Sequence, residues 1–501
     1  MEYNIEQQHK KGRLHAIERI QALLDENTFH EIQKGVTNHQ EGYGIETKQF
    51  PYDGVICGYG YINGRKVFLY AQDFTVLGGT LGHEHGLKIV NMIKKAVENK
   101  CPLIGIVDSG GARIQEGVYS LAGYGEMFFS QTMASGYIPQ ICIIAGTSAG
   151  GSAYSPGLSD FVFMIDQQSN MFITGPKVVE SVTGQKVNME DLGGARMHAT
   201  KSGVAHFMCK NEQDCYEKVR KLLDYIPHCY EEGGREEIAQ IEKMRRGTID
   251  MDSYRIVLPN NRRQIYEVKD VLKKIFDEDS IFEVHGDYAK NMVVYFAKLG
   301  GIHVGVVANN PAYMGVIDSN ASDKAARFIR YCDCYNIPII TFVDTPGFMP
   351  GLDQEQMGIV RHGAKVLYAY AEATTIKLTV IMRKAYGGAY IAMCSKHLGA
   401  DFVYAWPQAE IAVMGSEGAV QILYAKEIKY MSPGERSDFL EAKEEEYETK
   451  VMNADIAVQY GYVDAMLEPD DTREQLISDI LVLRDKTGLY NVKKKHGNMP
   501  M

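Results

Sequence analysis

The chain has 501 residues, 45% hydrophobic and 23% charged, which is the composition of a globular protein with a length typical of two to four domains. Its formal net charge is −11 and no cluster of Lys and Arg stands out, which argues against nucleic acid as a partner. The nine cysteines include no C-x-x-C pair, so we expect no zinc site and no other metal in this chain.

The N-terminal segment MEYNIEQQHKKGRLHAIERI is polar and lacks the apolar core of a signal sequence. No run of about 18 apolar residues follows it. The odd number of cysteines fits a reducing compartment. We therefore expect a cytoplasmic protein, which could still join a membrane complex through its partners.

In chain order, the first half alternates amphipathic helices with short apolar strands. Residues 19–32 predict a helix, an acidic turn and a strand. A strand over 66–72, a helix over 86–98 and a strand that ends in a Gly-rich turn over 102–111 follow. This alternation is typical of an α/β domain.

The second half repeats the first. Four segments return in the same order: 19–32 as 271–284, 102–117 as 338–351, 146–154 as 383–391, and 157–164 as 398–405. Such an ordered repeat indicates an internal duplication. We expect two similar α/β domains, 1–240 and 241–501, which meet in the polar, charged stretch 231–253.

Each half has two Gly-rich turns that closely follow a strand. In the first half they are Ser109-Gly110-Gly111-Ala112 and Gly150-Gly151; in the second they are Thr345-Pro346-Gly347-Phe348 and Gly387-Gly388-Ala389. Glycine allows close approach to the backbone, and a strand end that leads into a helix exposes unpaired N–H groups. Two such turns that converge could form an oxyanion hole. The alternative is that the turns serve packing alone.

Ser148 lies in Gly146-Thr147-Ser148-Ala149-Gly150, which matches the nucleophile elbow of serine hydrolases. The repeat speaks against a nucleophile, because aligning the Gly-Gly pairs places Ala385 opposite Ser148. No His or Asp stands out as its base either. A hydrolase that uses Ser148 is kept as a minor alternative.

Motifs along nearly the whole length resemble the carboxyltransferase subunits of biotin-dependent acyl-CoA carboxylases, transcarboxylases and decarboxylases. The most specific strings are DSGGARIQEGV (108–118), AGGSAYSPGLSDF (149–161), VDTPGFMPG (343–351), RKAYGGAYIAM (383–393) and YAWPQAEIAVMGSEGAV (404–420). The similarity is greatest to the propionyl-CoA carboxylase β and methylmalonyl-CoA carboxyltransferase branch.

The resemblance implies two tandem crotonase-like domains, each a spiral of ββα units. It implies that acyl-CoA binds mainly on the N-terminal domain and biotin on the C-terminal domain. The active site is then expected between the N-domain of one subunit and the C-domain of another, usually in a homohexamer built as a trimer of dimers.

The resemblance also assigns roles to the turns. N–H groups around Gly111, Ala112, Gly150 and Gly151 would hold the thioester oxygen. Those around Gly347, Phe348, Gly388 and Ala389 would hold the ureido oxygen of biotin, where negative charge develops as the carboxyl group leaves. Further substrate contacts are expected from Ser109, Gly110, Arg113, Gly387, Tyr390 and Ile391.

Two of these residues have a competing interpretation. Ile391 occupies the acyl-pocket position of the family, where propionyl-CoA carboxylases typically have Asp, so a propionyl preference is in doubt; core packing is the alternative. Arg113 could approach the CoA phosphates or form a structural salt bridge. For His83, His85 and His362 we expect solvated or hydrogen-bonded roles.

The chain has no biotinyl-lysine motif, so biotin must arrive on a separate biotin carboxyl carrier protein. The context could be an ATP-dependent carboxylase with a biotin carboxylase subunit, a transcarboxylase, or a sodium-pumping decarboxylase with a membrane subunit, in which this chain would be the α subunit. From a different class, the chain could be a non-catalytic scaffold of a biotin-protein complex.

Overall fold

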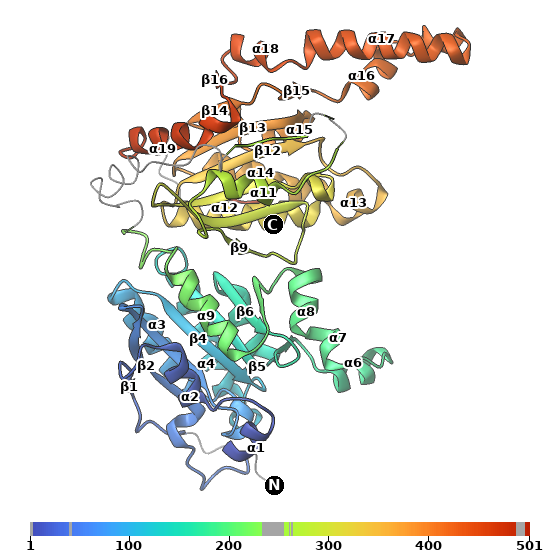
Figure 1. Ribbon diagram of the computed structural model, residues 1–501. Helices are drawn as coiled ribbons and strands as arrows, with labels where there is room; N and C mark the ends of the chain where they lie inside the picture. Colours follow the sequence, from blue (N-terminus) through green and yellow to red (C-terminus); the bar gives the residue numbers. More distant parts are fainter. Residues whose placement is uncertain (1–3, 40–42, 233–254, 260, 262–263, 487–495) are drawn as a thin grey trace. The chain divides into compact units, whose positions relative to one another are not determined.

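The computed structural model describes residues 4–39, 43–232, 255–259, 261, 264–486 and 496–501. The chain divides into two compact units, Met1–Gly233 and Gly234–Met501 (Figure 1). The domain boundary that the sequence predicts, between residues 240 and 241, lies outside the described residues.

Unit 1 is built on one eight-stranded sheet with the order β1-β2-β3-β4-β5-β6-β8, and the short β7 pairs with the far end of β5. The first three strands are antiparallel and the others parallel. The strands are β1 (His30–Ile32), β2 (Val55–Ile62), β3 (Arg65–Gln72), β4 (Leu103–Ser109), β5 (Gln140–Ala149), β6 (Phe161–Ile165), β7 (Asn170–Phe172) and β8 (Phe207–Cys209). Every residue of β4 is buried, as expected for a parallel strand covered on both faces.

Helices cover both faces of this sheet (Figure 1). They are α1 (Ile5–Lys10), α2 (Ala16–Leu23), α3 (His83–Glu98), α4 (Val118–Ala134), α5 (Tyr154–Leu158), α6 (Pro176–Thr183), α7 (Met189–Gly193), α8 (Ala195–Met197) and α9 (Glu212–Leu223). Apolar side chains of α3 and α4 share a core with Cys57 and Tyr70 of the sheet. Helix α2 packs against the opposite face of the sheet. There Gly60 leaves room for the side chain of Leu24, the residue that follows α2.

Unit 2 has the same architecture. Its sheet has the order β16-β14-β13-β12-β11-β10-β9, with β15 beside β13. The strands are β9 (Phe282–Val284), β10 (Met292–Leu299), β11 (Ile302–Asn309), β12 (Ile339–Thr345), β13 (Lys377–Tyr386), β14 (Phe402–Ala405), β15 (Glu410–Ala412) and β16 (Ala465–Met466). The helices are α11 (Val268–Ile275), α12 (Ser319–Cys334), α13 (Leu352–Met357), α14 (Ile359–Glu372), α15 (Gly387–Ala392), α16 (Ser416–Leu423), α17 (Pro433–Val451), α18 (Ala454–Gln459) and α19 (Thr472–Val482).

The duplication predicted from the sequence is confirmed. Strand order and strand directions agree between the units, and so does an irregularity. The ladder between β4 and β5 shifts register between Val107 and Ser109, and the ladder between β12 and β13 shifts between Val343 and Thr345. In both units this shift lies just before the first Gly-rich turn.

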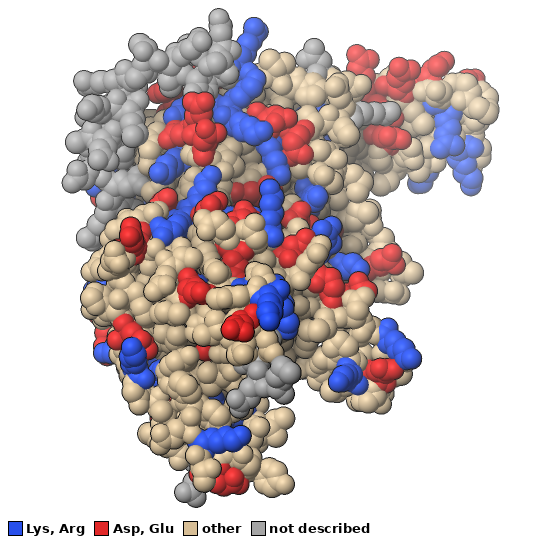
Figure 2. Space-filling model, turned by 60° about the horizontal axis from the view of Figure 1, so that its bottom comes forward, with Lys and Arg blue, Asp and Glu red and all other residues tan. Residues whose placement is uncertain are grey.

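Within the described ranges, no helix is long and apolar enough to cross a membrane. On the face drawn in Figure 2, acidic and basic side chains are interspersed among uncharged ones, and no broad area carries one sign of charge.

Candidate active site

The first Gly-rich turn of unit 1 begins where β4 ends. Leu81 and Ala112 form an isolated parallel bridge, in which the Leu81 N–H donates to the Gly111 carbonyl (2.9 Å) and the Arg113 N–H donates to the Leu81 carbonyl (2.9 Å). Because N–H groups alternate in direction along an extended segment, the Ala112 N–H points to the other side, away from Leu81.

The second turn of unit 1 follows β5 directly. Gly150 has φ +60°, a left-handed conformation that favours glycine, and opens a helical turn over Gly150–Ala153. The first N–H groups of a helix have no acceptor within it, so those of Gly150 and Gly151 are free to bind a ligand atom. The two turns meet: a Cβ on Gly111 would lie 2.8 Å from the Ala149 carbonyl oxygen.

Unit 2 presents the same pair of turns. The Ile317 N–H donates to the Gly347 carbonyl (3.0 Å) and the Met349 N–H to the Ile317 carbonyl (2.9 Å), which leaves the Phe348 N–H on the opposite side. Gly387 opens α15 with φ +59°. The turns lie side by side, because a Cβ on Gly388 would be 3.8 Å from the Phe348 ring.

Strand register fixes which residues of the two turns correspond. Ser148 pairs with Ser109 in unit 1, and Ala385 pairs with Thr345 in unit 2. The opposition of Ser148 and Ala385 expected from the sequence is therefore confirmed. By the same register, Gly150 and Gly151 correspond to Gly387 and Gly388. The resemblance had assigned the donor role to Gly388 and Ala389, which lie one residue later. The Ala389 side chain is buried, whereas Gly388 is exposed.

Ser148 does not have the surroundings of a nucleophile. Its side chain is buried, and its hydroxyl donates to the Ser152 hydroxyl at 3.2 Å. Nearby His198 is hydrogen-bonded to the Met171 carbonyl and the Ser202 hydroxyl. In the described part of the chain no histidine is hydrogen-bonded to Ser148. His83, His85 and His362 are hydrogen-bonded to their own surroundings, as expected.

Arg113 lies inside a buried ion-pair cluster. Its guanidinium donates to the Asp53 carboxylate (2.5 Å), the Glu116 carboxylate (2.7 Å) and the Thr80 carbonyl (3.0 Å), and the side chain has no exposed surface. A buried guanidinium held this way is not available to a CoA phosphate. Of the two interpretations that the sequence left open for Arg113, the geometry thus favours the structural salt bridge.

The positions after the second turn of unit 2 are accessible. Ile391 is 42% exposed, so core packing does not account for it. Tyr390 is half-buried, its ring lies 6.4 Å from the His397 ring, and its hydroxyl has no hydrogen-bond partner among the residues described.

An apolar cavity of about 860 Å³ adjoins the second turn of unit 1. Ala153 and Tyr154, two and three residues after that turn, form part of its wall. Its other walls come from α4, α5, β7 and the segments after β7 and α8, and include Phe128, Phe129, Leu158, Phe172, Ile173 and His198.

Sequence reasoning missed the arginines that support the turns. Asp108 and Asp344, which lie one residue before the ends of β4 and β12, are buried and each is paired with an arginine: Arg19 of α2 for Asp108, and Arg383 of β13 for Asp344. The repeat pairs the two aspartates in the sequence without assigning them a role. The arginines occupy unrelated positions in the two halves, so the repeat gives no signal for them.

Three comparisons with known proteins agree with this geometry. A family profile described as the carboxyl transferase domain matches residues 7–499. The propionyl-CoA carboxylase carboxyltransferase subunit of Haloferax mediterranei is 49% identical over 502 residues, which cover 100% of this chain and 96% of that protein. The methylmalonyl-CoA decarboxylase subunit alpha of Veillonella parvula is 47% identical, with 100% of this chain and 96% of that protein covered.

A solved structure gives the same result. The transcarboxylase 12S crystal structure, described as a hexamer with methylmalonyl-coenzyme A and methylmalonic acid bound, is 44% identical and matches with a TM-score of 0.93 over 99% of this chain and 94% of that chain. The tandem crotonase-like fold expected from the sequence is thereby confirmed.

Proposed function

Since the chain belongs to the carboxyl transferase domain family, we propose that it transfers a carboxyl group between biotin on a partner protein and the α-carbon of a short-chain acyl-CoA. One observation carries this proposal: each unit has a pair of converging Gly-rich turns with outward N–H groups. Carboxyl transfer develops negative charge at two oxygens, the thioester oxygen of the acyl-CoA and the ureido oxygen of biotin. Two sets of backbone donors match two such oxygens.

The turns of unit 1 are proposed to bind the thioester oxygen through N–H groups of Ala112, Gly150 and Gly151, while the Gly111 N–H donates to the Ser109 hydroxyl (3.2 Å) and supports the turn. Backbone donors on rigid strand ends need no reorganisation when an enolate forms, which is the property an oxyanion hole requires. The apolar cavity beside Gly151 offers a surface on which the rest of the thioester could lie. The exposed Gly110 is proposed to line the same site, and the buried Ser109 to support the turn.

The turns of unit 2 are proposed to bind the ureido oxygen of biotin. The fit is supported by the exposed Gly388, which lets a planar ring approach the backbone, and by the Phe348 ring beside it. Biotin would supply the chemistry of accepting and giving up the carboxyl group. The chain's own groups, the N–H donors of Phe348, Gly387, Gly388 and Ala389, would hold its oxygen, while the Gly347 N–H donates to the Thr345 hydroxyl (3.3 Å).

The relatives' names bear on substrate and context. They include propionyl-CoA carboxylase, methylmalonyl-CoA decarboxylase and a biotin-dependent acetyl-/propionyl-coenzyme A carboxylase. We favour propionyl-CoA and methylmalonyl-CoA as the substrate pair, with Tyr390 and Ile391 beside the acyl group. As partners we propose a biotin carboxyl carrier protein, a second copy of this chain in a hexamer, and either a biotin carboxylase or a membrane decarboxylase subunit.

The partial reaction tests this proposal. The purified chain would be incubated with malonyl-CoA, methylmalonyl-CoA or glutaconyl-CoA, with and without free biotin, and the thioesters followed by mass spectrometry. We expect biotin-dependent loss of the carboxyl group with the thioester intact, fastest for methylmalonyl-CoA. Thioester loss that ignores biotin and releases free CoA would contradict the proposal and favour a hydrolase.

A further inference from the structure

A buried aspartate ties the two Gly-rich turns together in each unit. Asp108 Oδ1 accepts a hydrogen bond from the Thr147 N–H at 3.1 Å, and Asp344 Oδ1 accepts one from the Lys384 N–H at 3.2 Å. Thr147 and Lys384 hold the same place in β5 and β13, three residues before Gly150 and Gly387. Each carboxylate therefore links the strand that enters the first turn to the strand that enters the second.

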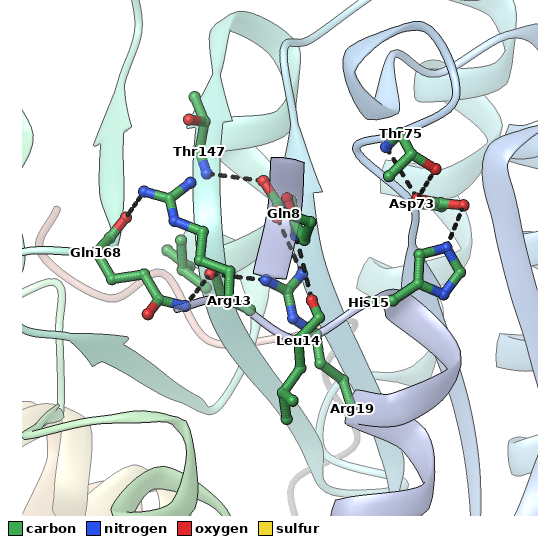
Figure 3. Close-up of polar contacts among 12 residues, drawn as sticks. Gln8, Arg13, Leu14, His15, Arg19, Asp73, Thr75, Thr147 and Gln168 are labelled. Atoms are coloured by element: carbon green, nitrogen blue, oxygen red, sulfur yellow. Dashed lines mark hydrogen bonds and ion pairs between the residues drawn. The ribbon is translucent and has the colours of Figure 1, made fainter. Parts of the chain in front are cut away.

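Each aspartate is neutralised by an arginine at the same oxygen. Arg19 Nη1 donates to Asp108 Oδ2 at 2.9 Å, and Arg383 Nε donates to Asp344 Oδ2 at 2.9 Å. Figure 3 shows Arg19, which extends from α2 toward the strands of the sheet, and Thr147. Both donate to Asp108. A buried carboxylate without a cation is strongly unfavourable, so the arginine stabilises the linking aspartate and holds it in place.

The two arginines come from different positions of the repeat. Helices α2 and α11 correspond residue by residue, and the place of Arg19 is taken by Val271, a core residue of unit 2. Strands β5 and β13 correspond likewise, and the place of Arg383 is taken by Gly146. A Cβ on Gly146 would overlap the Asp108 carboxylate itself, so unit 1 has no space for a side chain at that place.

The other partners of each guanidinium fit its direction of approach. Arg19 also contacts Glu212 (3.2 Å) and the Ala145 carbonyl (3.2 Å). Arg383 donates to the Gln264 carbonyl (2.9 Å) and lies over the Tyr266 ring, whose hydroxyl donates to Asp344 (2.8 Å). The two units thus meet one requirement by two routes.

We propose that Asp108 with Arg19, and Asp344 with Arg383, are equivalent positioning residues that hold the donor turns in register. The expected effect on kcat rests on the function proposed above. The expected effect on the rigidity of the turns does not.

The test removes the cation in unit 1. Arg19→Val should lower kcat of the biotin-dependent decarboxylation by up to about 10²-fold, because small misplacements of donors cost rate. Arg19→Lys, which keeps a positive charge beside Asp108, should retain more of the parent kcat than Arg19→Val. Arg220→Val removes another arginine of unit 1, which is paired with Asp25, and is the control that should leave kcat near the parent value.

Hydrogen exchange of the peptide over 140–153 supplies a readout that needs no activity. Exchange should be faster in Arg19→Val and close to the parent rate in Arg19→Lys and Arg220→Val. If the parent lacks biotin-dependent activity, the proposed function fails while this readout still decides the inference. Parent-like exchange in folded Arg19→Val, or parent-like kcat of that variant when the parent is active, would overturn it.

The same comparison in unit 2, Arg383→Leu against Arg383→Lys, gives the same decision if Arg19→Val does not fold. Its peptide covers residues 377–390. Faster exchange in Arg383→Leu is expected, and parent-like exchange in folded Arg383→Leu would contradict the proposal.

Discussion

At the scale of single residues, the proposed chemistry depends on backbone N–H groups, so a nearby side chain acts mainly through the space and the hydrogen bonds it provides. Ser148 is the clearest case, since its hydroxyl only reaches the Ser152 hydroxyl. Ser148→Ala removes one buried hydrogen bond, worth about 1 kcal/mol. We expect a slightly lower melting temperature and nearly unchanged kcat in the biotin-dependent assay. Loss of all turnover in the folded variant would return Ser148 to the role of nucleophile.

Ile391 is the residue where selectivity is expected to change. Its exposed side chain directly follows the turn Gly387-Gly388-Ala389-Tyr390. Ile391→Ala removes apolar contact surface, and pocket discrimination of this kind amounts to about 1–3 kcal/mol per methylene. We expect the ratio of kcat/KM for methylmalonyl-CoA over malonyl-CoA to fall by about tenfold or more. An unchanged ratio would place Ile391 outside the acyl pocket.

At the scale of elements, α3 anchors the loop Pro51–Gly54, in which Tyr52 and Asp53 have positive φ. Buried His85 of α3 is held neutral there: its Nδ1–H donates to the Asp53 carbonyl (2.9 Å) and its Nε2 accepts from the Gln72 amide (3.1 Å). Burial, and then the charges of Arg113 and Lys88, lower the pKa of His85 well below its usual value.

This sets the sign of a pH effect on stability. Below about pH 6.5 the unfolded chain protonates His85 and the folded chain does not, so the free energy of unfolding falls as the pH falls. Urea unfolding between pH 7 and 5 should show this contribution, at most about 1.4 kcal/mol per pH unit for one proton. In His85→Gln the slope should be smaller. An equal slope in both proteins would show that His85 is not responsible.

The elements themselves could largely be predicted from the sequence, because hydrophobic period and Gly-rich turns are local signals. The strand before Asp108 and its counterpart before Asp344 are examples. The ion pairs that support the turns could not be predicted, because tertiary packing brings Arg19 and Arg383 to equivalent carboxylates from unrelated positions in the sequence. Likewise, no local sequence pattern indicates whether the Arg113 side chain is buried in ion pairs or exposed to a ligand.

At the scale of the whole molecule, large apolar side chains remain exposed along α4, α5 and β7 of unit 1. Phe129 is 67% exposed, and Met133, Tyr154 and Ile173 are exposed beside it. A contiguous apolar area of this kind marks an interaction surface.

We expect the purified chain to assemble into a hexamer and Phe129→Glu to weaken the assembly, because a charge would be buried in the contact. Light scattering coupled to size-exclusion chromatography would measure the mass. Tyr43→Glu, at another exposed aromatic residue of unit 1, is the control and should leave the mass unchanged. A Phe129→Glu protein with the parent mass would place the contacts elsewhere.

Comparing variants of the two matching glycines decides whether both donor turns serve one reaction. Gly150→Ala and Gly387→Ala would each strain a turn at φ near +60°, whereas Gly125→Ala, on the exposed face of α4, meets no neighbouring atom and serves as the control. If both donor turns serve one reaction, each of the first two variants lowers kcat of biotin-dependent carboxyl transfer by about 10²–10³-fold while remaining folded. Near-parent activity in either folded variant would contradict the account.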